Sequence, residues 1–367
     1  MIDIPISKIW IDSEVHDRIK TVLDSGMIAQ GPQVAELEKM FCEVAGAEHA
    51  IAVNNGTTAL VLALEVLDLK PGDEVITSPF TFAATLNAII ESGATARFVD
   101  IDDDFLMDVD LAKFSISDKT KVLLPVHLYG QMVDMEGLEA VLSSRKDVTI
   151  LEDAAQSVGA RFNDHPAGSY GLGCFSLYAT KNVGAGEGGV VTTNDSLLAE
   201  RMRILRNQGM KARYEYVVPG HNYRLTDLQA AVANPQLKRI SEITEKRNQN
   251  ARKLLEGLSG LEGLGLPKSR PNDTHVWNQF TIRITSSAPT TREHLIQHLE
   301  KLGISSGIYY PKVVFDYDCY RNNPQVVIEH VPKAEKAARE VLSLPVHPFL
   351  TGEQINRIID GVRSAWS

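Results

Sequence analysis

Cysteine, tryptophan and basic residues are all scarce in this chain of 367 residues. Its three cysteines, Cys42, Cys174 and Cys319, lack the paired spacing of a zinc site and the density of a disulfide-rich secreted scaffold, so we expect buried thiols. Lysine and arginine total 37 against 47 aspartates and glutamates, a net charge of -10. That sign is opposite to the electrostatic footprint of a nucleic-acid binder, so we expect no nucleic-acid partner.

Long apolar runs and nucleotide-triphosphate or metal motifs are missing as well. The longest apolar run, residues 58–67, is too short to span a bilayer and carries Glu65, so we expect no membrane contact. Residues 1–5 lack the basic segment of a signal peptide, and we expect a cytoplasmic protein. Neither a G-K dipeptide nor an H-E-x-x-H motif occurs, so a P-loop and a zinc-protease site are excluded and no metal centre is expected.

What remains is typical of a large α/β protein. Hydrophobic residues make up 44%, and the length predicts about two domains. Short apolar runs alternate with helical patterns, which predicts a parallel sheet with crossover helices. The expected strands are residues 50–53, 73–77, 96–99, 122–126, 148–151 and 189–193, with a helix at 58–67.

The final third changes character. Residues 278–284 are predicted to form a strand, and Thr290 with Glu293 forms a capping-box pattern ahead of a helix. A further strand is expected at 308–310 and a terminal helix at 351–362. We therefore expect a large domain over residues 1–236 and a smaller α+β domain over 237–367, on which residues 1–25 could also pack.

Two glycine patterns resemble known motifs but lack their context. Residues 184–189 fit G-x-G-x-x-G, yet a strand follows them where a dinucleotide site needs a helix. Residues 303–307 fit G-x-S-x-G, yet they run from a helix to a strand, the reverse of a nucleophile elbow. Neither an NAD site nor a serine hydrolase is favoured.

Several segments make sense together around pyridoxal phosphate. This aromatic aldehyde needs an amine for a Schiff base, a carboxylate beside its ring nitrogen, donors for its phosphate and a flat partner for its ring. The amine is Lys181, whose small neighbours and following glycines allow close approach of a cofactor. Ser176 offers a hydroxyl to the phosphate. A solvated surface lysine is the ordinary alternative.

The carboxylate is Asp153. A predicted buried strand ends in Glu152 and Asp153, at the edge of the sheet where open α/β proteins bind ligands. A carboxylate there favours the protonated ring nitrogen, and Gln156, one turn further on, is placed to reach the ring oxygen. A simple helix cap is the alternative for the two acids.

The phosphate seat and the ring partner come from two other strand ends. Residues 54–58, Asn-Asn-Gly-Thr-Thr, link a strand to a helix, whose N-terminus attracts anions. An ordinary N-cap explains the same turn. Phe82 follows another strand end and could stack on a ring, although a core phenylalanine is the simpler reading.

Taken together, these residues resemble the sugar aminotransferases of the DegT/DnrJ/EryC1/StrS family. The resemblance runs along nearly the whole chain. It is carried by Gly31-Pro32, Asn55-Gly56-Thr57, Pro79-Phe80-Thr81-Phe82, Val126-His127-Leu128-Tyr129-Gly130, Glu152-Asp153-Ala154-Ala155-Gln156, Phe175-Ser176, Lys181-Asn182, Gly186-Glu187-Gly188-Gly189, Asn222-Tyr223-Arg224 and Leu344-Pro345-Val346-His347-Pro348.

The resemblance implies the fold type I architecture of pyridoxal-phosphate transferases, in which a mixed, mainly parallel sheet of seven strands is flanked by helices and joined by a smaller α+β domain. It also implies a role for each matched residue. Lys181 would form the Schiff base, Asp153 would contact the ring nitrogen, Gln156 the ring hydroxyl, and Phe82 would stack on the ring. The phosphate would be held by Gly56, Thr57, Ser176 and the neighbouring subunit's Asn222, which implies a homodimer with two shared active sites.

The implied reaction moves an amino group, with L-glutamate as the expected donor, to a keto sugar in amino-sugar biosynthesis. The expected acceptor is a nucleotide-linked 3- or 4-keto-6-deoxyhexose, and the sequence leaves UDP, dTDP and GDP open. Where the family commonly has His-Tyr-Pro, this chain has Tyr309-Tyr310-Pro311. That region often meets the sugar, so Tyr309 and Tyr310 are candidate substrate contacts and the sugar stays open.

One further departure from the family pattern and three alternative functions remain. Ala233-Asn234-Pro235 replaces a more helical stretch of the family pattern, so a helix break is expected there. Sugar dehydratases with the same cofactor carry histidine at the anchor position, whereas this chain keeps Lys181; a cyclitol aminotransferase stays open. From another class, a non-catalytic regulatory or binding protein would be signalled by loss of the lysine or the aspartate, and neither is lost.

Overall fold

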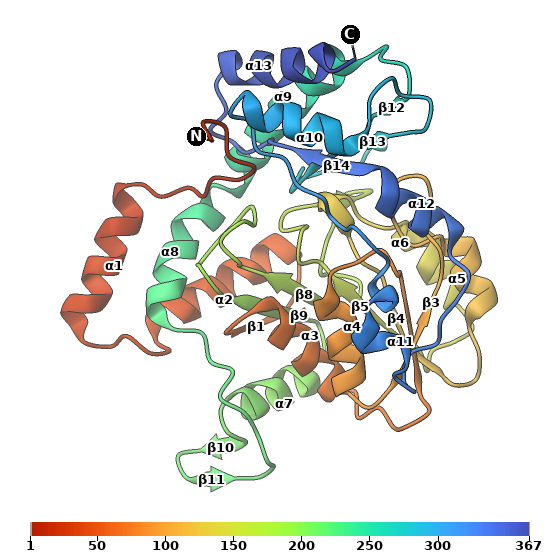
Figure 1. Cartoon of the computed structure of the whole chain (residues 1–367). Helices are drawn as coiled ribbons and strands as arrows, with labels where there is room; N and C mark the ends of the chain where they lie inside the picture. Colours follow the sequence, from red (N-terminus) through yellow and green to blue (C-terminus); the bar gives the residue numbers. More distant parts are fainter. Residues whose placement is uncertain (1, 367) are drawn as a thin grey trace.

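A seven-stranded sheet forms the centre of the larger part of the molecule in the computed structural model, which describes residues 2–366 (Figure 1). Only β9 runs antiparallel to its two neighbours, and all other adjacent pairs are parallel. The strand order is β1 (His49–Val53), β9 (Gly189–Thr193), β8 (Leu172–Ser176), β5 (Thr149–Asp153), β4 (Thr120–Leu124), β2 (Glu74–Thr77) and β3 (Thr95–Phe98). The expected mixed, mainly parallel sheet is therefore confirmed.

Helices flank this sheet because the crossovers between parallel strands need them. α3 is buried along seven consecutive residues, since it packs on β8 and β9 and against α4. α2 packs on β1 and β9, and on its other side meets α8. The helices of this part are α1 (Ser13–Ser25), α2 (Pro32–Ala45), α3 (Gly56–Glu65), α4 (Ala83–Glu91), α5 (Val109–Ser115), α6 (Met135–Val141), α7 (Ser196–Arg206) and α8 (Asp227–Lys238).

A second hydrophobic core lies around a three-stranded antiparallel sheet of order β12-β13-β14. Ile4 belongs to this core and pairs with Ile304 through a parallel bridge, whereas α1 packs against α8. The elements here are α9 (Ile240–Leu258), β12 (Leu264–Gly265), β13 (Phe280–Ile284), α10 (Arg292–Lys301), β14 (Val341–Leu344) and α13 (Gly352–Ser364), whereas α12 (Pro332–Glu340) packs its buried alanines into the first core. The domain border expected after residue 236 falls inside α8 and stays a prediction.

Several short elements connect the larger ones. A hairpin of β10 (Met210–Ala212) and β11 (Glu215–Tyr216) follows α7 and projects from the body of the molecule (Figure 1). Its Tyr214 and Tyr216 are exposed. The others are η1 (Leu128–Gly130), β6 (Arg161–Phe162), β7 (His165–Pro166), η2 (Val314–Asp316) and α11 (Asp318–Arg321).

The expected helix break at residues 233–235 is wrong. α8 continues through Pro235 to Lys238, and the chain turns only at Arg239. Proline removes one backbone donor, but this stretch is buried, and the Gln236 side chain donates to the carbonyls of Val232 and Gly184, each at 2.7 Å. Packing and side-chain hydrogen bonds therefore outweigh the local penalty.

Three other local expectations need correction. Residues 308–310 are not a strand; only Gly307 pairs with Ser343, and the Tyr129 hydroxyl then holds the carbonyl of Tyr309. α10 is capped by Thr291, which accepts from the backbone N–H of His294, so the cap lies one residue later than the Thr290 pattern. Cys174 is buried, Cys42 is half-buried and Cys319 is exposed, so three buried thiols were not found.

Candidate active site

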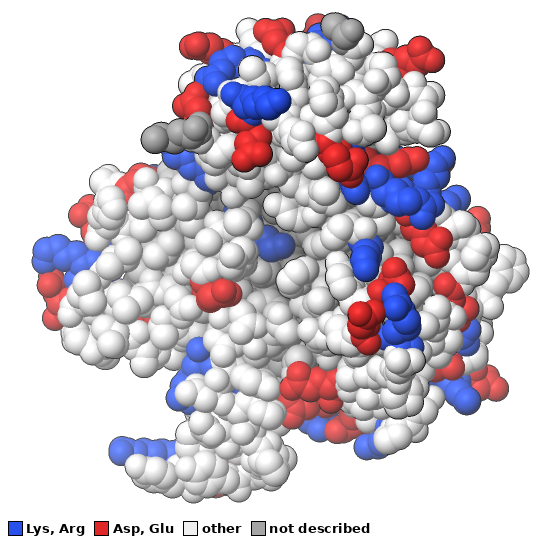
Figure 2. Space-filling view, viewed as in Figure 1, with Lys and Arg blue, Asp and Glu red and all other residues white. Residues whose placement is uncertain are grey.

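A cavity of about 760 Å³ opens where the carboxyl ends of the parallel strands meet the elements of the second core. Figure 2 shows a hollow on this face with a basic side chain inside it and few charges around it. Nine of the ten residues singled out from the sequence line this one cavity, and Asn222 is the exception. The nine are Gly56, Thr57, Phe82, Asp153, Gln156, Ser176, Lys181, Tyr309 and Tyr310.

Lys181 lies on the loop after β8, which backbone and side-chain hydrogen bonds hold in place. Leu177 N–H donates to the carbonyl of Gly188 at 2.8 Å, and Lys181 N–H donates to that of Tyr178 at 2.9 Å. Gln236 fastens the far side by exchanging two hydrogen bonds with the backbone of Gly184. Because both ends of the loop are held, the lysine side chain is directed into the cavity by the fold.

The amine of Lys181 has an unusual acidity. Burial lowers its pKa to about 8, although the carboxylate of Asp153 acts in the opposite direction. A lysine with this pKa is substantially neutral slightly above physiological pH, which a nucleophile and general base requires. The sequence motif found this residue, but its burial follows only from the fold.

Asp153 ends β5 in a buried position. Its Oδ2 accepts from the Thr85 hydroxyl at 2.8 Å, and its Oδ1 accepts from the backbone N–H of Ala155 at 3.2 Å. Burial raises its pKa, and these two donors with Lys181 act against that rise. No helix begins here, so the helix-cap alternative does not apply.

Gln156 connects the two parts of the molecule. Its Oε1 accepts from the backbone N–H of Tyr129 at 2.6 Å, which leaves Nε2 as the donor that faces the cavity. Nε2 donates to the Tyr310 hydroxyl at 3.3 Å. Burial raises the pKa of Tyr310, so its hydroxyl stays protonated and is itself free to donate. Two donors therefore stand beside Asp153.

The N-terminus of α3 forms an anion seat. Asn55, not a threonine, is the N-cap and accepts from the N–H of Thr58 at 2.8 Å. Within residues 2–366 the backbone N–H groups of Gly56 and Thr57 have no acceptor. Ser176 lies alongside, because a Cβ on Gly56 would come within 2.7 Å of the Ser176 Cβ. Glycine is thus required at this convergence of α3 and β8.

An aromatic rim surrounds the mouth of the cavity. Phe82 is the N-cap residue of α4 and is 60% exposed, although it lies beside the buried site. Its ring centroid is 6.0 Å from that of Tyr310. A flat exposed side chain in this place is suited to cover a planar ligand. Tyr309 is half-buried, and its ring contacts that of Tyr310.

Asn222 lies elsewhere. It is exposed and pairs its backbone with Asn207 at the base of the projecting hairpin. Its neighbour Tyr223 lines the cavity, but Asn222 does not. Within one chain the fold therefore does not bring this residue to the site, and its role across a dimer interface stays a prediction.

The sequence reasoning missed a buried pair behind Asp153. His127 Nε2 and Glu152 Oε2 lie 2.9 Å apart, and neither side chain has exposed surface. His127 Nδ1 accepts from the N–H of Val133 at 3.2 Å, so Nε2 carries the proton and donates to Glu152. Both residues stand in quoted motifs, but no local pattern signals that they meet.

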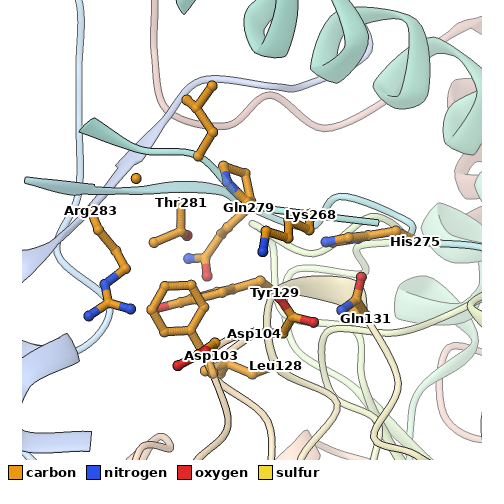
Figure 3. A pocket seen from close by; sticks show the side chains of 14 residues that line it. Asp103, Asp104, Leu128, Tyr129, Gln131, Lys268, His275, Gln279, Thr281 and Arg283 are labelled. Carbon is orange, nitrogen blue, oxygen red and sulfur yellow. The ribbon is translucent and has the colours of Figure 1, made fainter. Parts of the chain in front are cut away.

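A second, smaller cavity lies behind Tyr129 (Figure 3). Its volume of about 40 Å³ has room for a few water molecules at most. Lys268 and Arg283 face Asp103 and Asp104 across it, so its charges are mixed. It contains none of the residues singled out from the sequence, and the larger cavity is therefore the candidate site.

Two features are absent from residues 2–366. No helix there is both long and apolar enough to cross a membrane. No group of three or more histidines, cysteines, aspartates and glutamates is placed to hold a metal ion.

Comparisons with known proteins agree with this geometry. The model of the DegT/DnrJ/EryC1/StrS aminotransferase family matches residues 10–363. A dTDP-3-amino-3,4,6-trideoxy-alpha-D-glucose transaminase from Streptomyces venezuelae is 39% identical over 96% of this chain and 92% of its own. A UDP-N-acetyl-3-dehydro-alpha-D-glucosamine 3-aminotransferase from Acidithiobacillus ferrooxidans is 37% identical over 99% and 96%. A "pleiotropic regulatory protein" of Geobacillus stearothermophilus is 37% identical over 99% and 97%.

Solved structures give the same picture. The chain matches S. venezuelae DesV, solved in complex with a ketimine intermediate, with a TM-score of 0.90 and 39% identity over 96% of this chain and 94% of that one. It matches the PLP form of a protein from Streptococcus pneumoniae described as a sugar aminotransferase, with a TM-score of 0.91 and 28% identity over 99% and 98%. These similarities extend over both hydrophobic cores.

Proposed function

This chain belongs to the DegT/DnrJ/EryC1/StrS aminotransferase family, and we propose that it is a pyridoxal-phosphate enzyme that transfers an amino group from L-glutamate to a nucleotide-linked keto sugar in the cytoplasm. The observation that carries the proposal is the convergence of a half-buried lysine of pKa about 8, a buried carboxylate and a helix N-terminus with unused N–H groups on one cavity.

The residues of the cavity fit the cofactor. The free N–H groups of Gly56 and Thr57 and the hydroxyl of Ser176 would hold the phosphate, as anions are held at helix N-termini. Asp153 would face the ring nitrogen, Gln156 the ring oxygen, and Phe82 would cover the ring. When bound, pyridoxal phosphate supplies the aldehyde carbon that bonds covalently to amines and the electron sink that transamination requires.

Lys181 has two tasks in this proposal. Its Nζ would hold the cofactor, and as a free amine it would accept a proton from the donor's Cα. The lowered pKa lets the neutral amine exist near neutral pH, so Nζ could accept that proton and return it on the other side of the donor's nitrogen, two bonds away. Asp153 would act in its ionised form; burial raises its pKa, and the two hydrogen bonds and Lys181 oppose that rise by favouring the charged form.

The acceptor is proposed from the relatives. Those from S. venezuelae and A. ferrooxidans are named for amino sugars on dTDP and UDP. The cavity of about 760 Å³ lies in the usual range for ligand sites and has room for a cofactor with a sugar beside it. Tyr309 and Tyr310 line this cavity, where a sugar hydroxyl could bond to them.

A homodimer with shared sites is the second part of the proposal. It is supported by Asn222, which lies outside its own chain's cavity, and by the projecting hairpin whose Tyr214 and Tyr216 are exposed. In such a dimer the partner's Asn222 would complete the phosphate seat. Exposed aromatic side chains on a hairpin are well suited to packing against a second subunit.

A spectroscopic and mass-spectrometric experiment tests the cofactor. Purified protein is incubated with pyridoxal phosphate, scanned for the imine absorbance, reduced with borohydride and digested. We expect one adduct, on Lys181, which Lys181→Ala loses and Lys253→Ala, an exposed lysine on α9, retains. Glutamate should then bleach the imine band, and a panel of UDP, dTDP and GDP keto sugars should restore it. An unmodified Lys181 in folded, cofactor-soaked protein would overturn the proposal.

Mixed dimers test the shared sites. Lys181→Ala and Asn222→Ala chains are each expected to lose most activity, Lys181→Ala entirely. In a mixed dimer, one site combines the intact Lys181 of one chain with the intact Asn222 of the other, so activity should return to about one site in two. If both residues served the same chain's site, every site in the mixture would stay impaired and no recovery would be seen.

Retention of Lys181 and Asp153 favours aminotransfer over the other readings. A dehydratase of this fold would be expected to have histidine at position 181. A non-catalytic binding role is supported by one relative that is named as a regulatory protein. Such a protein, however, has no need of a reactive amine with a lowered pKa. The amino-acceptor panel separates these outcomes, because only an aminotransferase regenerates the imine band.

A further inference from the structure

Two buried threonine hydroxyls stand in line behind Asp153. Thr85, on α4, donates from Oγ1 to Asp153 Oδ2 at 2.8 Å, and Thr81 Oγ1 lies 2.7 Å from Thr85 Oγ1. The exposed fractions are 0% for Thr85, 3% for Thr81 and 5% for Asp153. All three are therefore nearly out of contact with bulk water, and only Thr81 and Asp153 border the cavity.

The direction of these bonds follows from proton counting. A carboxylate only accepts, so the single proton of the Thr85 hydroxyl is committed to Asp153. The contact between the two threonines must then use the Thr81 proton, with Thr85 Oγ1 as the acceptor. The hydrogen bonds therefore run from Thr81 to Thr85 and from Thr85 to Asp153, and the first bond polarises the second toward the carboxylate.

Other groups also face Asp153. Lys181 is the cation across the cavity, Tyr310 lies beside Gln156, and Cys174 lies on the neighbouring strand β8. His127, bonded to Glu152, lies on the remaining side. Lys181 and His127 both favour the charged form of Asp153, and the amine of Lys181 is the group that transamination needs in the neutral form.

We propose that Thr81 and Thr85 form a hydroxyl relay that keeps Asp153 ionised and oriented independently of the charge on Lys181. The hydrogen bonds of the relay are present whatever the protein does, whereas the use of the Asp153 carboxylate in catalysis rests on the proposed function. Thr85 is a positioning residue and Thr81 supports it. Oδ2 is turned to the α4 side by the relay and Oδ1 is held by Ala155, so the carboxylate has one fixed plane to present to a ring nitrogen.

The relay is tested first in the cofactor-free protein. The Asp153 carboxyl is titrated by infrared difference spectroscopy, with Asp153→Asn subtracted to assign its band. Thr85→Val removes the hydroxyl at nearly constant volume and should raise the pKa of Asp153 by about one unit or more, the size expected for a lost hydrogen bond to a charged group. Thr81→Val should give a smaller rise, and Thr85→Ser should restore the wild-type value.

Thr77→Val is the matched control. Thr77 is equally buried on β2, and its hydroxyl donates to the carbonyl of Leu124 at 2.8 Å instead of to a carboxylate. It should leave the Asp153 titration unchanged. An Asp153 pKa that is the same in Thr85→Val as in wild type, or a shift of equal size in Thr77→Val, would overturn the relay.

A second readout uses pyridoxal phosphate labelled with ¹⁵N in its ring. In wild type and Thr85→Ser the ring nitrogen signal should stay in the protonated position to higher pH than in Thr85→Val. If wild type takes up no cofactor on Lys181, the proposed function fails while the infrared titration still decides the relay. If the label binds but the titrations of wild type and Thr85→Val coincide, the relay fails and the proposed function stands.

Discussion

Gln156 and Tyr310 lie 154 residues apart in the chain, yet Gln156 Nε2 donates a 3.3 Å hydrogen bond to the Tyr310 hydroxyl at the wall of the cavity. The other end of the amide accepts from the backbone of Tyr129, and the Tyr129 hydroxyl in turn holds the carbonyl of Tyr309. The floor and the upper wall of the cavity are therefore joined by side-chain hydrogen bonds as well as by packing.

Tyr310→Phe should weaken this connection. The change leaves Gln156 Nε2 without its partner and removes one of two donors beside Asp153. We expect a loss of about 1 kcal/mol in the free energy of unfolding and a clear slowing of single-turnover reaction with glutamate. Tyr320→Phe is the control, because Tyr320 donates to Asn87 at 2.7 Å outside the cavity. Equal rates in wild type and Tyr310→Phe would remove Tyr310 from the site.

Glu152→Gln should destabilise the protein more than any exposed acid would. The Glu152 side chain is fully buried and accepts three hydrogen bonds, from His127, from Gly168 N–H at 2.8 Å and from Tyr170 N–H at 2.9 Å. Glutamine has an NH₂ group in place of one carboxylate oxygen, and this donor would face the donors that the oxygen now accepts from. We expect about 3 kcal/mol less stability in urea unfolding. Glu245→Gln, at an exposed ion pair with Arg252, should cost less than about 1 kcal/mol.

The stability of the cofactor-free protein should rise with pH in a defined window because of Lys181. Its pKa is about 8 in the folded protein, against the ordinary 10.5 expected in the unfolded chain. Below pH 8 folding has to bury a charged amine, whereas between about pH 8 and 10.5 only the unfolded chain still binds the proton, so the folded state gains.

This effect is measured against Lys181→Met, which lacks the titrating group. The side chain is only partly enclosed, so we expect the stability of wild type relative to the variant to increase by about 2 kcal/mol from pH 7.5 to 10.5. A difference that stays constant across this range would show that the amine of Lys181 is not buried. Urea unfolding at matched ionic strength provides the values.

Asp153→Asn should slow the proton shift that follows binding of the amino donor. An amide cannot keep a ring nitrogen protonated by its charge, so the electron sink is weakened. We expect single-turnover absorbance changes with glutamate to slow by about 100-fold or more. Asp118→Asn, at an exposed aspartate on the loop before β4, should react at the wild-type rate. An unchanged rate in Asp153→Asn would exclude this role.

The local patterns predicted much of the sheet. Alternation of short apolar runs placed β9 at its observed bounds and five other strands within about two residues of them, because a buried strand needs a continuous apolar run between polar ends. β8 was not predicted, because its sequence Leu-Gly-Cys-Phe-Ser has no continuous run of large apolar residues. Its place between β5 and β9 and its packing against α3 are seen only in the structure.

The candidate site divides in the same way. Asp153 and the α3 turn stand at predicted strand ends, which the topology of a parallel sheet brings together, and Lys181 was indicated by its small neighbours and following glycines. The sequence by itself was therefore enough to propose these residues and the class of chemistry. The donation from Thr85 to Asp153, the His127–Glu152 pair and the bridge from Gln156 to Tyr310 were decided only by the tertiary structure. Each joins residues 25 to 154 positions apart, and hydrogen bonds over such separations depend on how the elements pack, which periodicity and spacing do not encode.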